Sequence, residues 1–152
     1  MRLPTPTPPD AVTWLMQDIG PHSADVASVV QDDSNAWAVG FQDGSLVQLT
    51  WLDGPPRLEL LARVTRLEPL LAHELLEGLL MFNLLSADSG GARMALSASD
   101  RSLYLMRDLP PDALSLDGLR DALRSLAAMA GKWRDALAAQ RAGPTPPSSV
   151  LS

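Results

Sequence analysis

Cysteine is absent from the 152 residues of the chain. This absence excludes disulfide bonds, thiolate nucleophiles and cysteine-ligated zinc sites, and it is typical of a reducing compartment. Lysine is nearly absent too, because Lys132 is the single lysine among the 12 basic residues. The chain has 18 acidic residues, so its formal net charge is -6. Such a chain has no polybasic tract for a phosphate backbone or for anionic lipid. We therefore expect neither nucleic acid nor a membrane as a partner.

Long apolar runs are also missing. The most apolar segment, residues 70–85, is interrupted by His73, Glu74 and Glu77. It therefore falls short of the roughly 20 apolar residues that a membrane-spanning helix needs. Residues 1–10 contain prolines and threonines where a secretory signal would have an apolar core. We expect a cytoplasmic protein.

Motifs for catalysis are lacking as well. The histidines His22 and His73 do not stand at the spacing of paired metal ligands, and the chain has no phosphate loop, dinucleotide fingerprint or Gly-x-Ser-x-Gly motif. The acidic pair Asp32-Asp33 is more simply interpreted as part of a solvated loop than as a carboxylate cluster. We expect no enzymatic activity, no cofactor and no metal site.

Proline-rich segments frame the chain. Residues 1–9 and 143–152 contain too few apolar groups to offset the entropy cost of ordering them, so we predict a disordered tail at each end. Residues 10–142 remain as one domain. Since 46% of the chain is hydrophobic, this domain has enough apolar residues to build a core.

Turn residues and apolar periodicity divide this domain into helices and strands. Asp43-Gly44 predicts a type I′ hairpin turn, and Ser115 is expected to cap the last helix. Residues 21–35 are ambiguous, with a short strand at 26–30 as one interpretation. The expected helices cover residues 10–19, 69–85 and 115–142, and the expected strands cover 37–41, 46–51, 58–64, 92–98 and 101–107.

The resulting α-βββ-α-ββ-α order predicts an α+β fold with helices packed on one twisted antiparallel sheet. Alternation assigns one set of strand residues to the core face: Trp37, Val39, Phe41, Val47, Leu49, Trp51, Leu58, Leu60, Met94, Leu96, Leu103 and Leu105. The opposite face mixes polar residues with Leu46, Leu61, Ala95, Tyr104 and Met106. If these apolar residues are contiguous, they form a surface suited to an extended peptide. If they are scattered, they need no explanation.

The middle helix carries more apolar surface than one core requires. On a helical wheel, its polar stripe contains only His73, Glu74 and Glu77, and the apolar arc covers about 180° where a little over 100° would serve one core. Two interpretations remain. The helix is either sandwiched within one chain or lies at the seam of a homodimer, and the second is favoured because two-fold dimers are the commonest soluble assemblies.

In order, spacing, size and acidity, residues 10–142 resemble the class I type III secretion chaperones of the Tir chaperone family. Three parts of the chain carry this resemblance. They are the strands WAVGFQDGSLVQLTW and RLELLARV, the helix LLEGLLMFNLL with the hairpin GGARMALSASDRSLYLMRDLP, and the closing helix LSLDGLRDALRSLAAMAGKWRDAL.

The resemblance implies a homodimer, and an unfolded N-terminal effector segment that wraps around apolar patches on the sheet and first helix. It also implies delivery of the client to a secretion ATPase, with no nucleotide bound to the chaperone itself. The candidate effector-binding residues are Trp14, Leu46, Leu61, Tyr104 and Met106. The candidate dimer-interface residues are Leu71, Leu75, Leu79 and Phe82. Two alternatives stay open: a dimeric adaptor for a folded partner, and a small enzyme with a site in a cavity.

Overall fold

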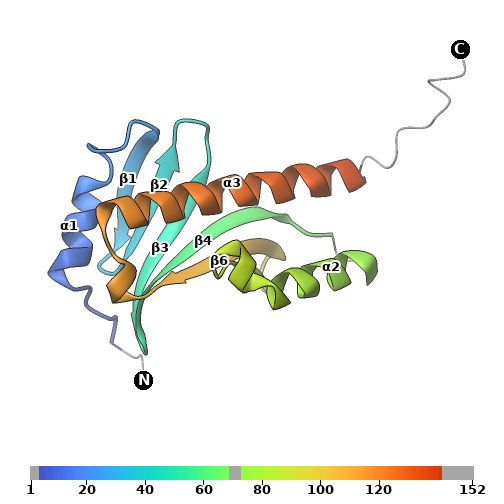
Figure 1. The fold of residues 1–152 in the computed structure, drawn as a ribbon, viewed down its shortest axis with the longest axis horizontal. Coiled ribbons are helices and arrows are strands. Elements are labelled where there is room, and N and C mark those ends of the chain that lie inside the picture. Colours follow the sequence, from blue (N-terminus) through green and yellow to red (C-terminus); the bar gives the residue numbers. More distant parts are fainter. Residues whose placement is uncertain (1–3, 69–72, 142–152) are drawn as a thin grey trace, which may run out of the picture.

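The structure of the protein, a computed structural model, describes residues 4–68 and 73–141. Three α-helices and six β-strands follow one another in the order that Figure 1 shows. They are α1 (Asp10–Asp18), β1 (Val26–Asp33), β2 (Ala36–Phe41), β3 (Leu46–Asp53), β4 (Pro56–Arg66), α2 (His73–Leu84), β5 (Arg93–Leu96), β6 (Ser102–Leu109) and α3 (Leu116–Arg141). Short 3-10 turns at Ser86–Ser89 and Pro111–Ala113 complete the described chain.

The strands form one antiparallel sheet in the order β1-β2-β3-β4-β6-β5, which confirms the predicted α+β fold. The sheet has one strand more than the alternation predicted. This strand, β1, occupies the segment that the sequence left ambiguous. It shows no alternating pattern because neither of its faces is buried: only Val26 and Val29 are half-buried, and the register with β2 shifts after Val26.

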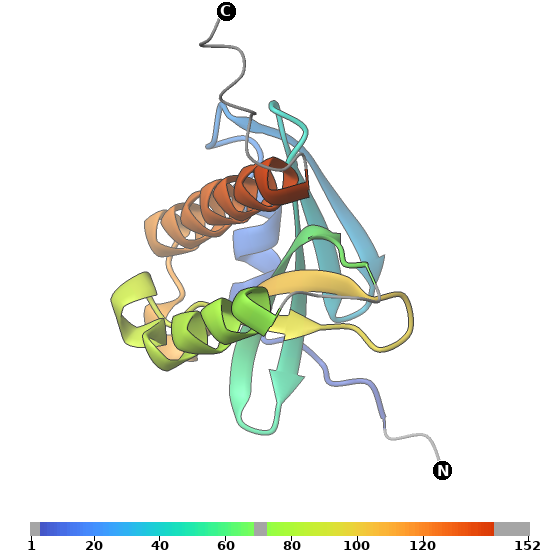
Figure 2. The same ribbon diagram turned by 90° about the vertical axis from the view of Figure 1, so that its right-hand side faces the viewer.

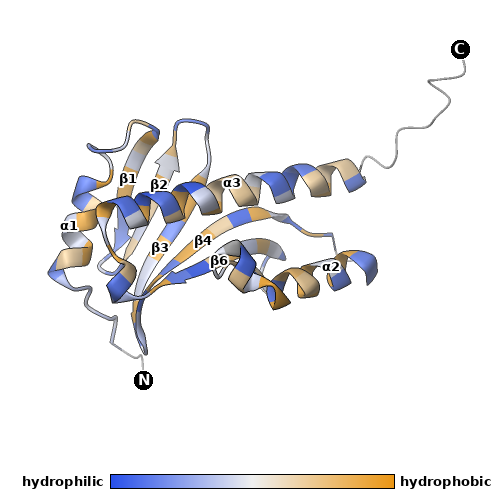
Figure 3. Cartoon of the chain, viewed as in Figure 1, coloured by the Kyte–Doolittle hydropathy of each residue, from blue (hydrophilic) through white to orange (hydrophobic). Residues whose placement is uncertain are grey.

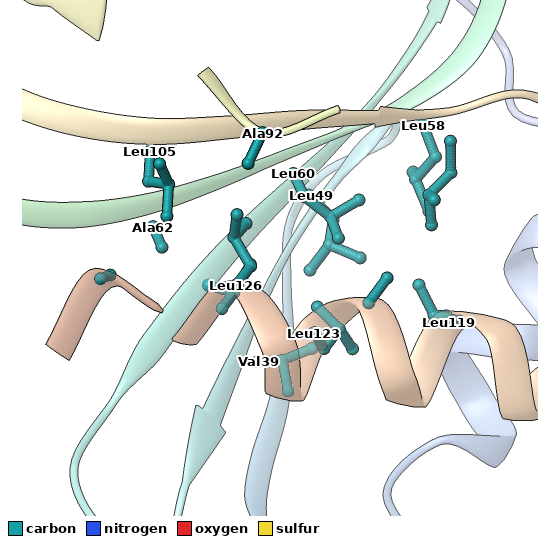
Figure 4. Packing of buried hydrophobic residues seen from close by; sticks show 14 of the residues in the cluster. Val39, Leu49, Leu58, Leu60, Ala62, Ala92, Leu105, Leu119, Leu123 and Leu126 are labelled. Atoms are coloured by element: carbon teal, nitrogen blue, oxygen red, sulfur yellow. The ribbon is translucent and has the colours of Figure 1, made fainter. Parts of the chain in front are cut away.

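All three helices lie on the same side of the sheet, as Figure 2 shows for α2 and α3. Helix α3 crosses β3, β4 and β6, and α2 packs against the edge strand β5. Leucines at helical spacing on α3, including Leu119, Leu123 and Leu126, face the sheet in Figure 4. All three are at least 98% buried. Complete burial of a leucine contributes roughly 1.5–3 kcal/mol, so this stripe fixes α3 across the sheet.

Two local predictions about turns and caps have different outcomes. The Ser115 hydroxyl accepts a hydrogen bond from the Gly118 N–H at 3.0 Å, which confirms the cap of α3. The type I′ turn is wrong, because of the residues in the turn only Gly44 has a positive φ, of 91°. The Phe41 N–H donates to the Ser45 carbonyl at 2.8 Å, so the loop has three residues and needs one left-handed position, which Gly44 fills.

The predicted core face is buried with one exception. Leu96 is 44% exposed, so its place in the core was wrong. It is the last residue of β5, a four-residue strand at the edge of the sheet, and the chain leaves the sheet directly after it. The side chain therefore lacks neighbours on two sides.

Candidate functional site

The face of the sheet opposite the helices is open, and four of the five candidate binding residues lie on it. Strand pairing places Leu61 opposite Met106 and Arg63 opposite Tyr104. The Leu46 side chain is 52% exposed, and the other three candidates are half-buried. The apolar residues of this face are therefore neighbours and not scattered.

A hollow of about 360 Å³ opens among them, which we call the open-face hollow. Its lining consists of Asp43, Gly44, Ser45, Leu46, Gln48, Leu61, Arg63, Val64, Tyr104 and Arg134. The Ser45 N–H donates to the Asp43 carboxylate at 2.9 Å and lowers the pKa of that group. The lining of the hollow thus combines apolar side chains with charged ones. This combination suits a peptide that carries both kinds of side chain.

Trp14 does not join this group. It lies on α1, on the helix side of the sheet, where it is 62% exposed. A separate groove of about 450 Å³ runs between α1 and the edge strand β1, but Trp14 is not part of its lining. The groove is lined by Thr13, Met16, Gln17, Gly20, Pro21, Val26, Ala27, Ser28, Val29, Gln31 and Trp37. Sequence reasoning missed it, because β1 itself shows no alternating pattern.

Arginines of α3 hold the segment that leads into β1. Arg124 makes two hydrogen bonds of 2.6 Å to the Asp25 carboxylate, which lower the pKa of Asp25. Arg120 donates to the Ser23 hydroxyl and to the His22 carbonyl, both at 2.9 Å. These contacts position β1 at the edge of the sheet, where its outer backbone groups have no neighbouring strand.

The apolar arc of α2 divides into a covered half and an uncovered half. Leu79 is 8% exposed and belongs to the core of its own chain, and Leu75 and Phe82 are half-buried against that core. The Phe82 ring meets the Trp133 ring edge to face at 5.4 Å. Leu71 lies outside the described residues. Of the candidate interface residues, those that are described thus contact their own chain.

The uncovered half of α2 was not singled out from the sequence. In Figure 3 apolar colour extends along most of the helix. Five large apolar side chains, from the first turn of α2 to just after its C-terminal end, are between 41% and 85% exposed, and we call them the α2 ridge. They are Leu76, Leu80, Met81, Leu84 and Leu85. Sandwiching within one chain is therefore the wrong interpretation for this half of the helix.

Asn83 fixes α2 to the sheet. Its side-chain amide donates to the Met94 carbonyl at 3.1 Å and accepts from the Met94 N–H at 2.6 Å. The Asn83 side chain thereby makes the two backbone hydrogen bonds with Met94 that a neighbouring strand would make at this edge of the sheet. The α2 ridge is consequently held in a defined orientation on the outside of the protomer.

On the open face, a group of charged residues lies beside the hollow. Asp108 accepts a hydrogen bond from Arg93 at 2.9 Å and lies 3.8 Å from the Nε atom of Arg57. Burial, together with the nearby Asp108 charge, raises the pKa of Glu59. Within residues 4–68 and 73–141, no three His, Asp or Glu side chains gather as they would around a metal ion, and no helix is long and apolar enough to cross a membrane.

Comparison with known proteins identifies relatives of this fold. A search of the curated proteins finds no sequence match. Among solved structures, a chain of the ExsC-ExsE complex superposes with a TM-score of 0.71 at 18% identity, over 86% of this chain and 96% of that chain. A chain of the HopA1-SchA chaperone-effector complex gives a TM-score of 0.67 at 18% identity, over 82% and 94% of the two chains.

A third structure, the heterodimeric ExoU-SpcU complex from the type III secretion system of Pseudomonas aeruginosa, gives a TM-score of 0.53 at 15% identity, over 81% of this chain and 93% of that chain. At these identities the likeness shows a shared fold. The family model of the Tir chaperone protein (CesT) family matches residues 22–134, which span all six strands and most of α3. The chain therefore belongs to the Tir chaperone protein (CesT) family, as its resemblance to class I type III secretion chaperones indicated.

Proposed function

We propose that this protein is a cytoplasmic type III secretion chaperone that binds an N-terminal, non-globular segment of one or more effector proteins. It keeps that segment competent for secretion and delivers it to the secretion ATPase. The observation that carries this proposal is the open-face hollow, where Leu46, Leu61 and Tyr104 form an apolar surface on an otherwise acidic protein. The family is one of chaperones, and one of the similar folds occurs in a chaperone-effector complex.

The surface suits an extended client better than a folded one. An extended chain places alternate side chains on one side, and these can enter hollows on a sheet while the backbone stays outside. The edge of β1 adds unpaired backbone groups beside a groove, which an extended segment can use for hydrogen bonds. A folded partner would instead need one broad complementary face.

We further propose that the protein acts as a homodimer through the α2 ridge. Five large exposed apolar side chains on one short segment make a patch of the kind that marks protein interfaces. A two-fold axis beside α2 would pack each ridge against its copy, since such an interface uses the same patch on both chains. Leu46, Leu61 and Tyr104 lie on the other face of the sheet and would stay accessible in that dimer.

The proposal is tested by coexpression with candidate effectors and by calorimetry with their N-terminal segments. Leu46→Asp places a charge in the open-face hollow and should abolish or strongly weaken client binding. Leu96→Asp is the matched control, because Leu96 is similarly exposed on the same sheet but lies outside the hollow. Both variants should keep the wild-type circular dichroism spectrum.

Two results would contradict the proposal. Equal binding by both variants would mean that the client uses another surface. Binding of a folded partner alone, with no affinity for unfolded effector segments, would make the protein a dimeric adaptor.

A further inference from the structure

A second hollow, of about 700 Å³, lies where β4 continues past the N-terminal end of its neighbour β3. The β3–β4 pairing ends at Val47 and Ala62, so the β4 carbonyls that follow have no partner strand on this side. Arg134 of α3 supplies the hydrogen bonds that a partner strand would give these carbonyls. Its Nε donates to the Val64 carbonyl and its Nη2 to the Arg63 carbonyl, both at 2.8 Å. We call this the arginine hollow. Its lining consists of Arg63, Val64, Thr65, Arg66, Leu67, Glu68, Arg101 and Arg134.

The positive charge of this hollow is unusual for so acidic a chain. Four of the chain's 12 basic residues line it, and Glu68 is the one carboxylate among its lining residues. By contrast, Arg93 pairs with the Asp108 carboxylate and Arg124 with the Asp25 carboxylate. The hollow therefore attracts anions, while the remainder of the protein repels them.

The hydrogen bonds recorded for three of these arginines go to neutral acceptors. Arg63 donates to the Ser102 hydroxyl at 3.1 Å, Arg101 donates to the Glu68 carbonyl at 3.2 Å, and Arg134 donates to the two β4 carbonyls. A guanidinium carries five N–H donors. These contacts therefore orient the three side chains and leave donors available for an anionic ligand.

Arg101 supplies an independent observation. It is the one non-glycine residue of the described chain with a positive φ, of 60°, and its backbone is held by hydrogen bonds with Ser97 and Leu67. Its Nε is buried and has no hydrogen-bond partner among the described residues. A buried N–H without an acceptor is costly, so a ligand oxygen that reaches it would be stabilised.

The arginine hollow continues the open-face hollow, because Arg63, Val64 and Arg134 line both. Between Leu61 in one hollow and Arg66 in the other, β4 advances five residues, or about 17 Å at roughly 3.3 Å per residue. An extended segment alongside β4 with an apolar side chain near Leu61 therefore places residues about four to six positions away at the arginines. Arginine matches the planar geometry of a carboxylate through paired hydrogen bonds.

We propose that the arginine hollow binds an aspartate or glutamate side chain of the client, about four to six residues from the apolar side chain that enters the open-face hollow. This inference rests on the proposed function, since both hollows would hold the same extended segment. It assigns the client a composite motif, in which one apolar anchor and one acidic residue stand at a fixed spacing.

Synthetic peptides test the motif without a known effector. Each probe is an extended serine- and threonine-rich peptide with a Leu-Ser-Leu anchor and one glutamate, placed at successive distances on either side of the anchor. Its matched control carries glutamine at the same position. We expect the glutamate probe to bind about tenfold more tightly than its control, as loss of one charged hydrogen-bonded contact implies. This preference should appear only at distances near five residues.

One substitution and one control test the arginines. Arg101→Gln, which retains an amide donor, should abolish the preference for glutamate while leaving affinity for the glutamine probe unchanged, because Arg101 does not line the open-face hollow. Lys132→Gln is the control, because it removes one positive charge from an exposed position outside both hollows. In the wild type, the glutamate probe should also shift the Arg101 Nε–H resonance in an NMR titration.

The outcomes separate this inference from the proposed function. Binding of both probes with equal affinity would overturn the inference and leave the chaperone proposal intact. Absence of binding by every probe would overturn both. A shift of the Arg101 resonance by inorganic phosphate, with none by the glutamate probe, would make the hollow a phosphate site and also overturn the inference.

Discussion

Removal of two ridge leucines should convert the protein from dimer to monomer without unfolding it. Leu80 and Leu84 are 68% and 85% exposed in the protomer, so their truncation to alanine removes little from its core. Covering such a side chain in an interface contributes about 1–2 kcal/mol for its exposed part. A two-fold interface contains each residue twice, so Leu80→Ala with Leu84→Ala should weaken dimerisation by about 4–8 kcal/mol, or roughly three to six orders of magnitude in Kd.

Analytical ultracentrifugation at micromolar concentration measures this change, with the melting temperature as the check on folding. The matched control is Leu46→Ala with Val30→Ala, which truncates two exposed apolar side chains away from the edge strand β5 on which α2 packs, and should remain dimeric. Leu79→Arg is a poor test, because Leu79 is 8% exposed and a charge there would destabilise the protomer itself. A wild-type monomer, or a dimer that survives the double truncation, would refute the reasoning.

Three further results are expected. Because burial raises the pKa of Glu59, the folded state loses stability as pH rises from the ordinary glutamate pKa through the raised one, so Glu59→Gln should raise Tm near neutral pH and have no such effect near about pH 4. Asn83→Ala leaves the Met94 backbone groups unpaired and should cost roughly 1–3 kcal/mol in urea unfolding. A chain cut to residues 9–143 should keep its Tm within about a few degrees in calorimetry, because the tails have little to bury; a larger loss would mean that a tail docks on the domain.

The sequence alone determined the elements whose faces differ in environment. In β2, β3 and β4 one face is buried under helices, so apolar residues such as Val39, Leu49 and Leu60 alternate with others and reveal the strand. Helix α3 has one buried stripe with a spacing of three or four residues. The same alternation placed Leu46, Leu61, Tyr104 and Met106 together on the second face, because residues two apart on a strand share a side.

Sequence signals failed for elements that do not have one buried face and one exposed face. Strand β1 is exposed on both sides, so its residues carry no period and only pairing with β2 makes it a strand. The helical wheel revealed the wide apolar arc of α2, but it could not show which half of that arc contacts the core of the protomer. That choice depends on Asn83 binding Met94 and on Phe82 meeting Trp133, contacts with residues that are distant in the chain.

The arginine hollow lies entirely beyond what the sequence could indicate. Arg63, Arg101 and Arg134 are separated by more than 30 residues each, and no local pattern connects them. They meet because β4 pairs with β6, and because α3 crosses the sheet near the N-terminal end of β3. The sequence thus determined the family, the order of elements and the surface on which a client can lie. Only tertiary packing decided where charge gathers beside that surface, because such a cluster arises from long-range pairing and not from local periodicity.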